Sequence, residues 1–432
     1  MQKSHPRRLT PVLLLGLLLS QSAGAVPFGA FDPKSLAMGG AGVASGTSEN
    51  AAYYNPALMA MYKTRKERGN NSRYMFPVAL VHVSDSILTI KDLDEKGLVE
   101  NLDSSISDFN GTPNAQNARA VLNDARDLQG NLGDLLDGPV YGDVVVGTVL
   151  SIAHKYGGGA IIITRRLVGD GAVGNYNSDL QLLQESVDAM EFIEAGGDPL
   201  VAATQFPNVI DTNGDINFTT DQLTSAAAGS GMDITEIGMA MSKQYNVYGK
   251  DIAFGLTPKV MKVSTYDLRA DASTGSFDKV RQDGQDYDVN LDFGLAHQID
   301  ARWRAGIVIK NMHSMSYKTA LGNTLKIKPQ VRAGASYDWG WRGLYAFDID
   351  VLPNDAVGIG SDSQVMSLGA EWPIYSYLKV RGGITRNMQG IGAGNDPLYS
   401  LGIHWGPSFF LDAAIAYSAY EIAGAIQLGH SF

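Results

Sequence analysis

The chain contains no cysteine, so disulfide bonds and thiolate metal ligands are excluded. Its seven histidines are scattered, and no pair of them has the spacing of metal ligands. Sequence motifs of serine hydrolases, zinc proteases and phosphate-binding loops are also missing. A catalytic triad assembles in space rather than in sequence, so an enzyme remains an alternative. We nevertheless expect no enzyme and no cofactor.

Long hydrophobic runs are missing beyond the N-terminus, and only 18% of the residues are charged. The mature protein should therefore have no transmembrane helix, which needs about 20 apolar residues. The mean hydropathy of −0.07 is compatible with a transmembrane β-barrel, in which polar and apolar residues alternate. A net charge of −11 argues against direct nucleic-acid binding, which normally requires a basic patch.

The N-terminus has the three parts of a secretory signal peptide. Lys3, Arg7 and Arg8 form a positive region, Val12–Leu19 is apolar, and Ala23–Ala25 has the small residues of a cleavage site. We expect residues 1–25 to be removed, which leaves 31 basic and 45 acidic residues, a net charge of −14. A signal anchor is the alternative, but the apolar run is too short to span a bilayer.

Apolar and polar residues alternate along most of the remaining chain, which is typical of β-strands. In the segment 286–296, for example, every second residue from Tyr287 to Leu295 is apolar, and the residues between are Asp, Asn or Gly. We predict fourteen strands, near 72–83, 147–155, 158–167, 233–244, 250–265, 285–298, 302–313, 326–338, 342–352, 364–373, 376–386, 396–405, 408–419 and 422–432.

The connections between these strands alternate between short and long. Long ones occupy 84–146, 168–232, 266–284, 314–325, 353–363 and 387–395, whereas the others have only a few residues. A bacterial outer-membrane barrel has this rhythm, with short periplasmic turns and long outer loops. The sequence thus predicts an all-β transmembrane protein: an antiparallel outer-membrane barrel of about 14 strands, in a Gram-negative bacterium. The short link at 419–421 departs from this rhythm.

Two further features suit such a barrel. Aromatic residues stand at strand ends, where interfacial girdles need them: Trp303, Trp339, Trp341, Trp372, Tyr375, Tyr377, Trp405, Phe409 and Tyr417. The last strand places Ile426 and Leu428 on one face and ends on Phe432. This ending resembles the C-terminal signal that the barrel-assembly machinery binds, with His430 where Tyr is commoner.

Two of the long connections carry helical patterns, at 87–136 and 177–230. Leu180, Leu183, Val187, Met190 and Ile193 follow one another at spacings of three and four residues, which gives one apolar helix face. We interpret both inserts as structured, partly helical outer loops that cap the barrel. The alternative is a flexible loop with transient helix.

The residues after the signal peptide carry a family resemblance. They read FDPKSLAMGGAGVA at 31–44 and NAAYYNPA at 50–57. This opening resembles the long-chain fatty-acid transporter superfamily of outer-membrane barrels, and more closely the family labelled as a conjugative-plasmid TraF-like protein. The resemblance implies a fourteen-strand barrel with an N-terminal hatch, here placed at 26–70, followed by the barrel at 71–432. Leu58 departs from the glycine usual in the transporters.

Glycines in this segment allow tight packing inside a crowded lumen. Pro56 keeps Asn55 out of the helical region, and the Asn55 side chain can bond its own backbone. The resemblance makes this segment a hatch and candidate ligand path; its residues are Met38, Gly39, Gly40, Gly42, Tyr54, Asn55, Pro56 and Ala57. The alternative is a periplasmic tail with a glycine-rich linker.

One acidic segment is a weak candidate for a calcium loop. Asp211, Asn213 and Asp215 present oxygens at alternate positions, and Asp221 follows. However, Ile216 replaces the glycine that such a loop needs for its turn, and Asp221 comes one residue early. A plain acidic outer loop is the competing interpretation.

Charged residues on the polar strand faces should point into the lumen. Those we single out are Arg302, Arg304, Arg332, Asp288, Asp292 and Asp348; Lys310, Lys326, Lys328, Lys379, Arg381, Asp286 and Asp350 belong to the same set. Neighbouring strands of opposite charge would form cross-strand pairs. Such a ladder either fills the lumen and fixes strand register, or forms a polar path or a site for anionic headgroups.

Two functions remain open. The superfamily resemblance implies a channel or transporter for small hydrophobic molecules. The closer family label implies an outer-membrane component of conjugative transfer, or a docking and assembly barrel without transport. The expected partners are outer-membrane lipid, the barrel-assembly machinery and a small hydrophobic ligand. An apolar pocket beside residues 38–57 would favour transport, and a lumen filled by ion pairs would favour docking.

Overall fold

The computed structural model describes residues 28–61, 73–137, 139–154, 157–174, 176–273, 276–281, 285–357, 362–389 and 395–431. The predicted signal peptide, the last part of the predicted hatch and Phe432 lie outside the described residues. Among the helices that are described, none combines the length and the apolar character needed to cross a membrane.

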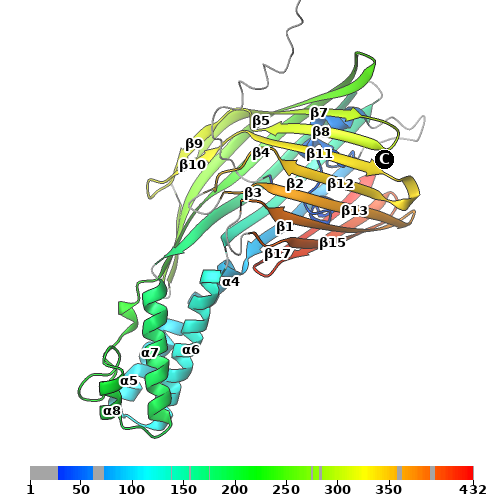
Figure 1. Cartoon of the computed structure of the whole chain (residues 1–432). Coiled ribbons are helices and arrows are strands. Elements are labelled where there is room, and N and C mark those ends of the chain that lie inside the picture. The colour runs from blue at the N-terminus through cyan, green and yellow to red at the C-terminus, as the bar shows by residue number, and fades with distance from the viewer. Residues whose placement is uncertain are drawn as a thin grey trace, which may run out of the picture.

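Fourteen antiparallel strands of the described chain close into a barrel (Figure 1). They are β1 (Arg73–Ser84), β2 (Val140–His154), β3 (Gly157–Gly174), β4 (Ala226–Val247), β5 (Lys250–Asp271), β7 (Asp286–Gln298), β8 (Trp303–Lys310), β11 (Gln330–Asp338), β12 (Leu344–Asp350), β13 (Val365–Tyr375), β14 (Leu378–Asn387), β15 (Leu398–Trp405), β16 (Phe409–Tyr417) and β17 (Glu421–Ser431). β1 closes the ring by pairing with β17, from Arg73 opposite Ser431 to Ser84 opposite Glu421. Each predicted strand is present, so the fold prediction is confirmed.

The barrel wall has apolar side chains outside, and its inner face combines polar side chains with apolar ones that pack against the plug. On β7, Tyr287 and Val289 are 68% and 71% exposed on the outer face, whereas Asn290 and Asp292 are buried on the inner face. This follows from the two-residue period of a strand. It is the arrangement expected of a barrel surrounded by lipid.

The two ends of the barrel differ, as predicted. Short turns join strands at the end where the C-terminus lies, and that end carries most of the exposed aromatic residues of the predicted girdle, including Trp303, Trp372 and Trp405. Long connections lie at the opposite end. There β2 to β5 extend well beyond the other strands, since β4 and β5 each have 22 residues.

Three short strands at this end were not predicted. β6 (Ser276–Arg281) pairs with the end of β5. β9 (Met315–Lys318) and β10 (Thr324–Ile327) form a separate hairpin. The predicted strand 326–338 was therefore wrong at its start: Ile327 belongs to the hairpin, where it packs with Met232 and Val263 against the inner wall.

The two long inserts form one helical head, comprising residues 85–137 and 176–225. Its helices are α4 (Asp85–Lys96), α5 (Leu98–Gly111), α6 (Ala115–Asp137), α7 (Tyr176–Glu194), α8 (Pro199–Gln205) and the 3-10 turn η2 (Thr220–Gln222). The predicted face of α7 is confirmed, since Leu183, Val187 and Met190 are buried in a core shared with α5 and α6.

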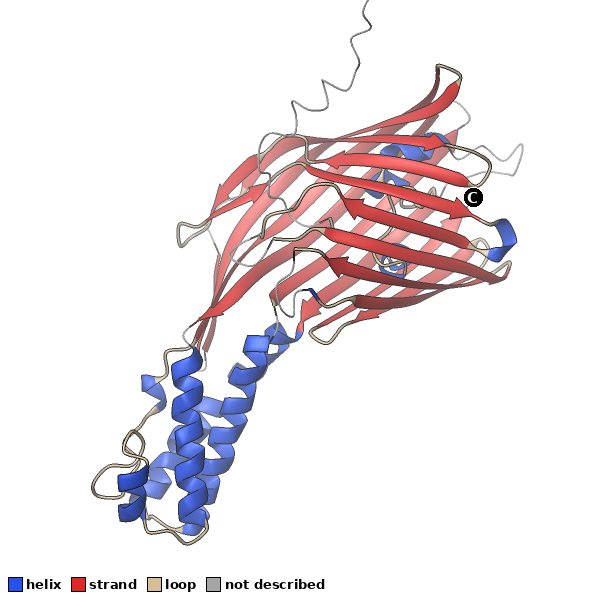
Figure 2. Ribbon diagram, in the orientation of Figure 1, coloured by secondary structure: helices blue, strands red, loops and turns tan. Residues whose placement is uncertain are grey.

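The head does not cap the barrel, contrary to our interpretation. It projects away from the long-loop end as a bundle (Figure 2). Much of its apolar surface packs within the head itself: Phe109 of α5, Leu128 of α6 and Leu183 of α7 belong to one buried cluster.

Residues 28–61 form a plug inside the barrel (Figure 1, blue). The plug contains α2 (Pro33–Ala37), α3 (Ala51–Tyr54) and the 3-10 helix η1 (Pro56–Met61). One more 3-10 turn, η3 (Gly340–Arg342), lies between β11 and β12. The N-terminal hatch of the expected fold is thus a folded unit that fills the lumen.

Candidate functional site: the plugged lumen

Short local motifs fold the first half of the plug. Asp32 caps α2 by accepting a hydrogen bond from the Ser35 backbone at 3.1 Å, and Pro33 occupies the first helical turn. The same carboxylate accepts a bond from the Asn50 side chain at 2.9 Å, which ties the two halves of the plug together. After α2, Gly39 and Gly40 have φ of +67° and +87°, which residues with a side chain rarely adopt.

Asn55 organises the second half of the plug. Its side-chain oxygen accepts a hydrogen bond from the Ala57 backbone at 3.1 Å, which is the turn predicted from the Asn-Pro pair. Its nitrogen donates to the carbonyl of Val43 in the plug and to that of Leu295 in β7, both at 3.0 Å. Asn55 therefore links both halves of the plug to the barrel wall.

The plug spans the lumen from one wall to the other. α2 contacts β14 to β17, and η1 contacts β4, β5 and β7. Tyr54 is fully buried, and its hydroxyl accepts a hydrogen bond from the Phe31 backbone at 2.6 Å. The plug makes no strand pairing with the wall, so individual side-chain bonds and close packing hold it in place.

Several glycines of the barrel wall leave space into which the plug packs, and we call each such position a seat. A β-carbon added at Gly402 would stand 2.5 Å from the β-carbon of Ala37, and one at Gly383 would meet the backbone of Met38. Gly255 and Gly294 face Ala57 and Asn55 in the same way. Sequence reasoning missed these glycines, because a glycine on a strand indicates close approach without indicating of what.

Asp348 holds the glycine-rich bend of the plug. One oxygen of its carboxylate accepts hydrogen bonds from the backbone N–H groups of Gly42 and Val43, at 2.7 and 2.9 Å. Asp348 lies on β12 and was predicted to face the lumen. Its function is thus to satisfy plug backbone groups that would otherwise be buried without partners.

Beside it, Arg332 and Asp350 form a fully buried ion pair. The guanidinium donates to both carboxylate oxygens, at 2.6 and 3.1 Å. The guanidinium carbon of Arg332 lies 4.3 Å from the ring centre of Phe28 in the plug, which is a cation–π contact.

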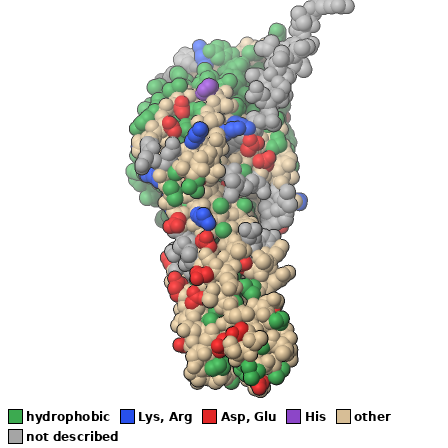
Figure 3. Space-filling model, turned by 90° about the vertical axis from the view of Figure 1, so that its left-hand side faces the viewer, with side chains coloured by type: hydrophobic (Ala, Val, Ile, Leu, Met, Phe, Trp, Pro, Cys, Tyr) green, Lys and Arg blue, Asp and Glu red, His purple; other side chains and the backbone are tan. Residues whose placement is uncertain are grey.

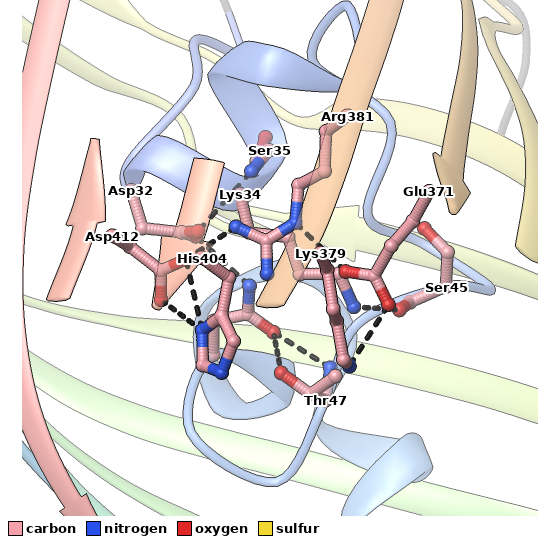
Figure 4. A network of polar contacts seen from close by, with 11 residues as sticks. Asp32, Lys34, Ser35, Ser45, Thr47, Glu371, Lys379, Arg381, His404 and Asp412 are labelled. Carbon is pink, nitrogen blue, oxygen red and sulfur yellow. Dashed lines mark hydrogen bonds and ion pairs between the residues drawn. The ribbon is translucent and has the colours of Figure 1, made fainter. Parts of the chain in front are cut away.

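A larger network lies beside α2 (Figure 4). Arg381 donates to Glu371 at 2.7 Å and to Asp412, while Lys379 also contacts Glu371, at 3.0 Å. His404 lies 3.2 Å from the Asp412 carboxylate. Glu371 and Asp412 were not predicted, although an isolated acidic residue in an otherwise apolar strand is the signal that would have found them.

Charges on the opposite wall also pair. Lys259 bridges Glu236 and Asp292 at 3.2 and 3.1 Å. Lys310 lies 3.3 Å from the ring centre of Tyr53 in the plug. Glu236, Lys259, Lys310 and Tyr53 border a cavity of about 40 Å³ beside the plug. The plug therefore leaves little free space against this wall.

The remaining predicted lumen charges have different positions. Arg304 points inward and donates to the plug carbonyl of Ala44 at 3.4 Å. Arg302 was wrongly placed in the lumen: it lies in a short turn, is exposed, and donates to the hydroxyl of Tyr337. Asp288 lies near the long-loop end and accepts a bond from Tyr317 of β9 at 2.8 Å.

The candidate calcium loop is a tight turn of the head. The Asp211 carboxylate accepts bonds from the backbone of Asn213 and Asp215 at 2.8 and 3.0 Å, and bonds of this kind hold its pKa below the usual range. The Ile216 backbone N–H donates a hydrogen bond to the side-chain oxygen of Asn110 in α5. Asp221 belongs to η2, and the described residues contain no group of three or more His, Asp or Glu suited to a metal.

The face that the sequence predicted for Ile426 and Leu428 of the final strand lies on the outside of the barrel. Ile426 and Leu428 are 56% and 50% exposed on the outside of the barrel. Both belong to β17, which pairs with β1 and β16.

Comparison with known proteins identifies the family of this chain. Residues 52–350 match the model of a family described as "F plasmid transfer operon, TraF, protein", which is more than half of the chain. The chain belongs to this family. No curated protein is significantly similar to this TraF-family member.

Several solved structures are similar to this chain. The Ralstonia pickettii toluene transporter TbuX matches with a TM-score of 0.50 and 12% identity, over 94% of this chain and 99% of that one. The CymD monoaromatic hydrocarbon channel has a TM-score of 0.48 and 12% identity, over 93% and 98% of the two chains. The P. putida toluene transporter TodX has a TM-score of 0.44 and 10% identity, over 94% and 99%.

The TraF-like part of the family resemblance is thereby confirmed. The barrel also has the fold of TbuX, in agreement with the fold that the transporter part of the resemblance implied. At 12% identity, the likeness to TbuX establishes the outer-membrane barrel fold of the TraF-family chain and nothing about its cargo.

Proposed function

We propose that this TraF-family protein is a gated channel for small hydrophobic molecules in the outer membrane of a Gram-negative bacterium. The observation that carries the proposal is the way the plug is held. Residues 28–61 are a compact unit that shares no strand pairing with the wall, so the plug can shift without unzipping the barrel. The likeness of the fold to a protein named as a toluene transporter supports the same function.

Transport requires the plug to move. The cavity beside Tyr53 and Lys310 has a volume of about 40 Å³, too small for a hydrocarbon ligand, whose sites are usually several hundred Å³. Hydrogen bonds such as that from Thr385 to the Gly39 carbonyl, at 2.6 Å, must therefore break in the open state. Such bonds have a modest net free energy, about 0.5–1.5 kcal/mol each, because water replaces them.

The proposed orientation of the barrel in the membrane follows from the difference between its two ends. The short-turn end faces the periplasm, and the helical head projects from the cell surface. Cleavage near Ala25 would leave the plug at the start of the mature chain, and the barrel-assembly machinery would bind the last strand through Ile426, Leu428 and Phe432. Outer-membrane lipid would contact the exposed apolar belt.

A docking barrel without transport is the second candidate. Two observations favour it: ion pairs such as Arg332–Asp350 and Lys259–Asp292 fill the lumen, and a helical head projects from the barrel as a binding element could (Figure 2). The family description, which refers to a plasmid transfer operon, agrees with such a role.

Uptake by whole cells separates the two candidates. Cells that lack their own hydrocarbon and fatty-acid channels would express the full chain, and the uptake of radiolabelled toluene and oleate would be measured. Transport predicts faster uptake of at least one of them than in cells with an empty vector. Equal uptake, together with a fall in plasmid transfer when the chain is deleted from its native host, would overturn the channel and support docking.

A further inference from the structure

The outer face of the barrel is apolar where β3, β4, β5 and β7 run side by side. Four residues stand opposite one another across these strands and are between 44% and 71% exposed: Ile163, Ile237, Val260 and Val289. Exposed apolar side chains of this kind belong against the hydrocarbon of a membrane. These four residues, which we call the apolar row, therefore mark the level of the lipid chains on this part of the wall.

The next outward-facing row toward the long-loop end is polar. It lies two residues further along each strand, about 7 Å away, and consists of Arg165, Thr235, Lys262 and Tyr287. Charged and tyrosine side chains are typical of the level at which hydrocarbon gives way to headgroups. We call these four residues the headgroup row.

Basic residues gather around the headgroup row. Arg281 of β6 is 54% exposed, and its guanidinium lies 4.0 Å from the carboxylate of Asp233 on β4. Lys279, two residues earlier on β6, shares this outer face. With Arg165 and Lys262 there are thus four cations, and Asp233 is the only acidic residue on the outer face of β3 to β6 in the described part of the chain. An excess of positive charge therefore faces the headgroups here.

The guanidinium of Arg165 is held in place and still has donors to spare. Its Nε and one terminal nitrogen donate to the two oxygens of Asp233, at 2.9 and 2.7 Å. The other terminal nitrogen has no partner among the described residues, and 66% of the side chain is exposed. An arginine that is oriented in this way loses little side-chain freedom when it binds an anion.

Thr235 stands between Arg165 and Lys262 on the outer face. Neighbouring strands are about 4.8 Å apart, so the backbones of the two basic residues are about 10 Å apart. Both side chains are long enough to reach a group that lies over the threonine. A guanidinium, a hydroxyl and an ammonium can therefore meet on one anion. A phosphate offers an oxygen to each of them, and arginine and lysine are the residues that commonly bind it.

We propose that the headgroup row binds a phosphate carried by a lipid of the outer leaflet, between Arg165 and Lys262. The acyl chains of this lipid lie along the apolar row, and the two cations of β6 add to the attraction for its anionic head. The inference goes beyond the channel function, and it rests on the proposed orientation, in which the helical head is outside the cell. A free phosphate ion offers the same oxygens, so the test has to separate these two sources.

The experiment measures binding to the purified full chain in a lipid-free amphipathic polymer. The probes are lipid A with two phosphates, the same lipid after removal of its phosphates, and inorganic phosphate, and each affinity is read from a thermophoresis titration. Lys262→Gln removes one cation of the site and leaves the Arg165–Asp233 pair intact, so it serves alone should Arg165→Gln fail to fold. Lys250→Gln, at the short-turn end of the same strand, is the matched control.

We expect lipid A with two phosphates to bind the native chain. Lys262→Gln should weaken this binding about tenfold, because a charge-assisted bond to phosphate is lost. Adding Arg165→Gln should weaken it further, and Lys250→Gln should leave it unchanged. Equal affinity for the lipid without phosphates would overturn the recognition of phosphate. An equal loss in Lys250→Gln would reduce the effect to overall charge and overturn the site.

Inorganic phosphate distinguishes a lipid from a free ion. We expect it not to displace lipid A at equal concentration, because the apolar row contributes only to the binding of the lipid. Displacement at equal concentration would make the free ion the ligand and remove the lipid.

The leaflet is tested in intact cells with a single introduced thiol, since the chain lacks cysteine. Val201 of α8 is 45% exposed on the helical head, and we expect Val201→Cys to react with a membrane-impermeant maleimide added outside. Reaction only after the cells are broken would place the headgroup row at the inner leaflet and overturn the assignment to the outer one.

Uptake of toluene, measured separately, keeps this site apart from the proposed channel. Binding of lipid A that depends on Lys262, without uptake above that of empty-vector cells, would keep the site and remove the channel. Uptake without phosphate-dependent binding would keep the channel and remove the site.

Discussion

The side-chain oxygen of Asn55 lies where a β-carbon at Gly294 would stand. The plug and the wall thus meet at a point where neither residue can be enlarged. Several wall glycines are used in this way, and together they make the fit between plug and barrel specific. The proposed gating depends on that fit, because the plug has to leave it when the channel opens.

Gly294→Ala should loosen the plug. The added methyl group forces Asn55 from its seat, and overpacking of this kind costs about 1–3 kcal/mol. We expect larger and more frequent channel openings in planar bilayers and a lower melting temperature. The control is Gly424→Ala, where nothing lies within 4 Å of the added carbon. Identical conductance in the two variants would show that the seat at Gly294 does not restrain the plug.

Two substitutions at Asp348 test whether its carboxylate oxygen holds the plug in place. Both plug N–H groups bond to the same oxygen of its carboxylate, and the other oxygen has no hydrogen-bond partner among the residues that the structure describes. Asp348→Asn can keep both bonds, so we expect near-normal closure. Asp348→Ala leaves two buried donors unpaired, at about 1–3 kcal/mol each, and should open the channel. The readout is entry of a large antibiotic into cells; equal sensitivity of the two variants would contradict the role of this oxygen.

The Arg332–Asp350 pair should stabilise the barrel only as a pair. Arg332→Met leaves a buried carboxylate without its cation, which costs about 3–5 kcal/mol. Changing Asp350→Asn as well removes the charge while keeping acceptors for the Val365 backbone, which now bonds to Asp350 at 2.9 Å. We expect the double variant to recover most of the lost thermal stability, measured by the gel mobility of the heated barrel. A double variant as weak as Arg332→Met would refute this coupling.

Metal removal should leave the head unchanged. The Asp211 carboxylate is already bonded to its own turn, so calcium has to compete with backbone donors. We expect hydrogen exchange of the amides at 213 and 215 to be equal with calcium and with a chelator, and faster in Asp211→Ala. Slower exchange on addition of calcium would instead establish the loop as a calcium site.

Much of the fold could be predicted because strand alternation is a local property. The residues around Tyr287 and Asp292 alternate strictly, and their strand was found with nearly correct ends. The extensions of β3 and β4 were missed because they are rich in glycine, as at Gly169, Gly171 and Gly229, which carry no hydrophobic pattern.

The candidate site was predicted only in part. Asn55 and the glycine bend were found because their chemistry is local: a proline fixes the preceding residue, and glycine permits positive φ. The seats at Gly294 and Gly402 depend on which segment crosses the lumen, and no single sequence contains that information. The exposed position of Arg302 was missed because alternation assigns a face and does not show where a strand begins.

The helical head is strongly acidic. Residues 85–137 and 176–225 contain 20 acidic and 4 basic residues, a net charge of −16. On the face shown in Figure 3, acidic side chains are spread over the head, whereas the basic side chains lie on the barrel. This polarity keeps the head hydrated and away from anionic lipid, which suits a projecting element.

Locking the plug to the wall and measuring uptake tests whether movement of the plug opens the channel. Ala37→Cys with Gly402→Cys places two thiols where a shift of about 1 Å gives disulfide geometry. We predict that uptake of radiolabelled toluene or oleate falls to the empty-vector level when the pair is oxidised and returns on reduction, whereas uptake through either single variant does not respond to oxidation. Undiminished uptake through the locked protein would contradict a plug that gates the channel.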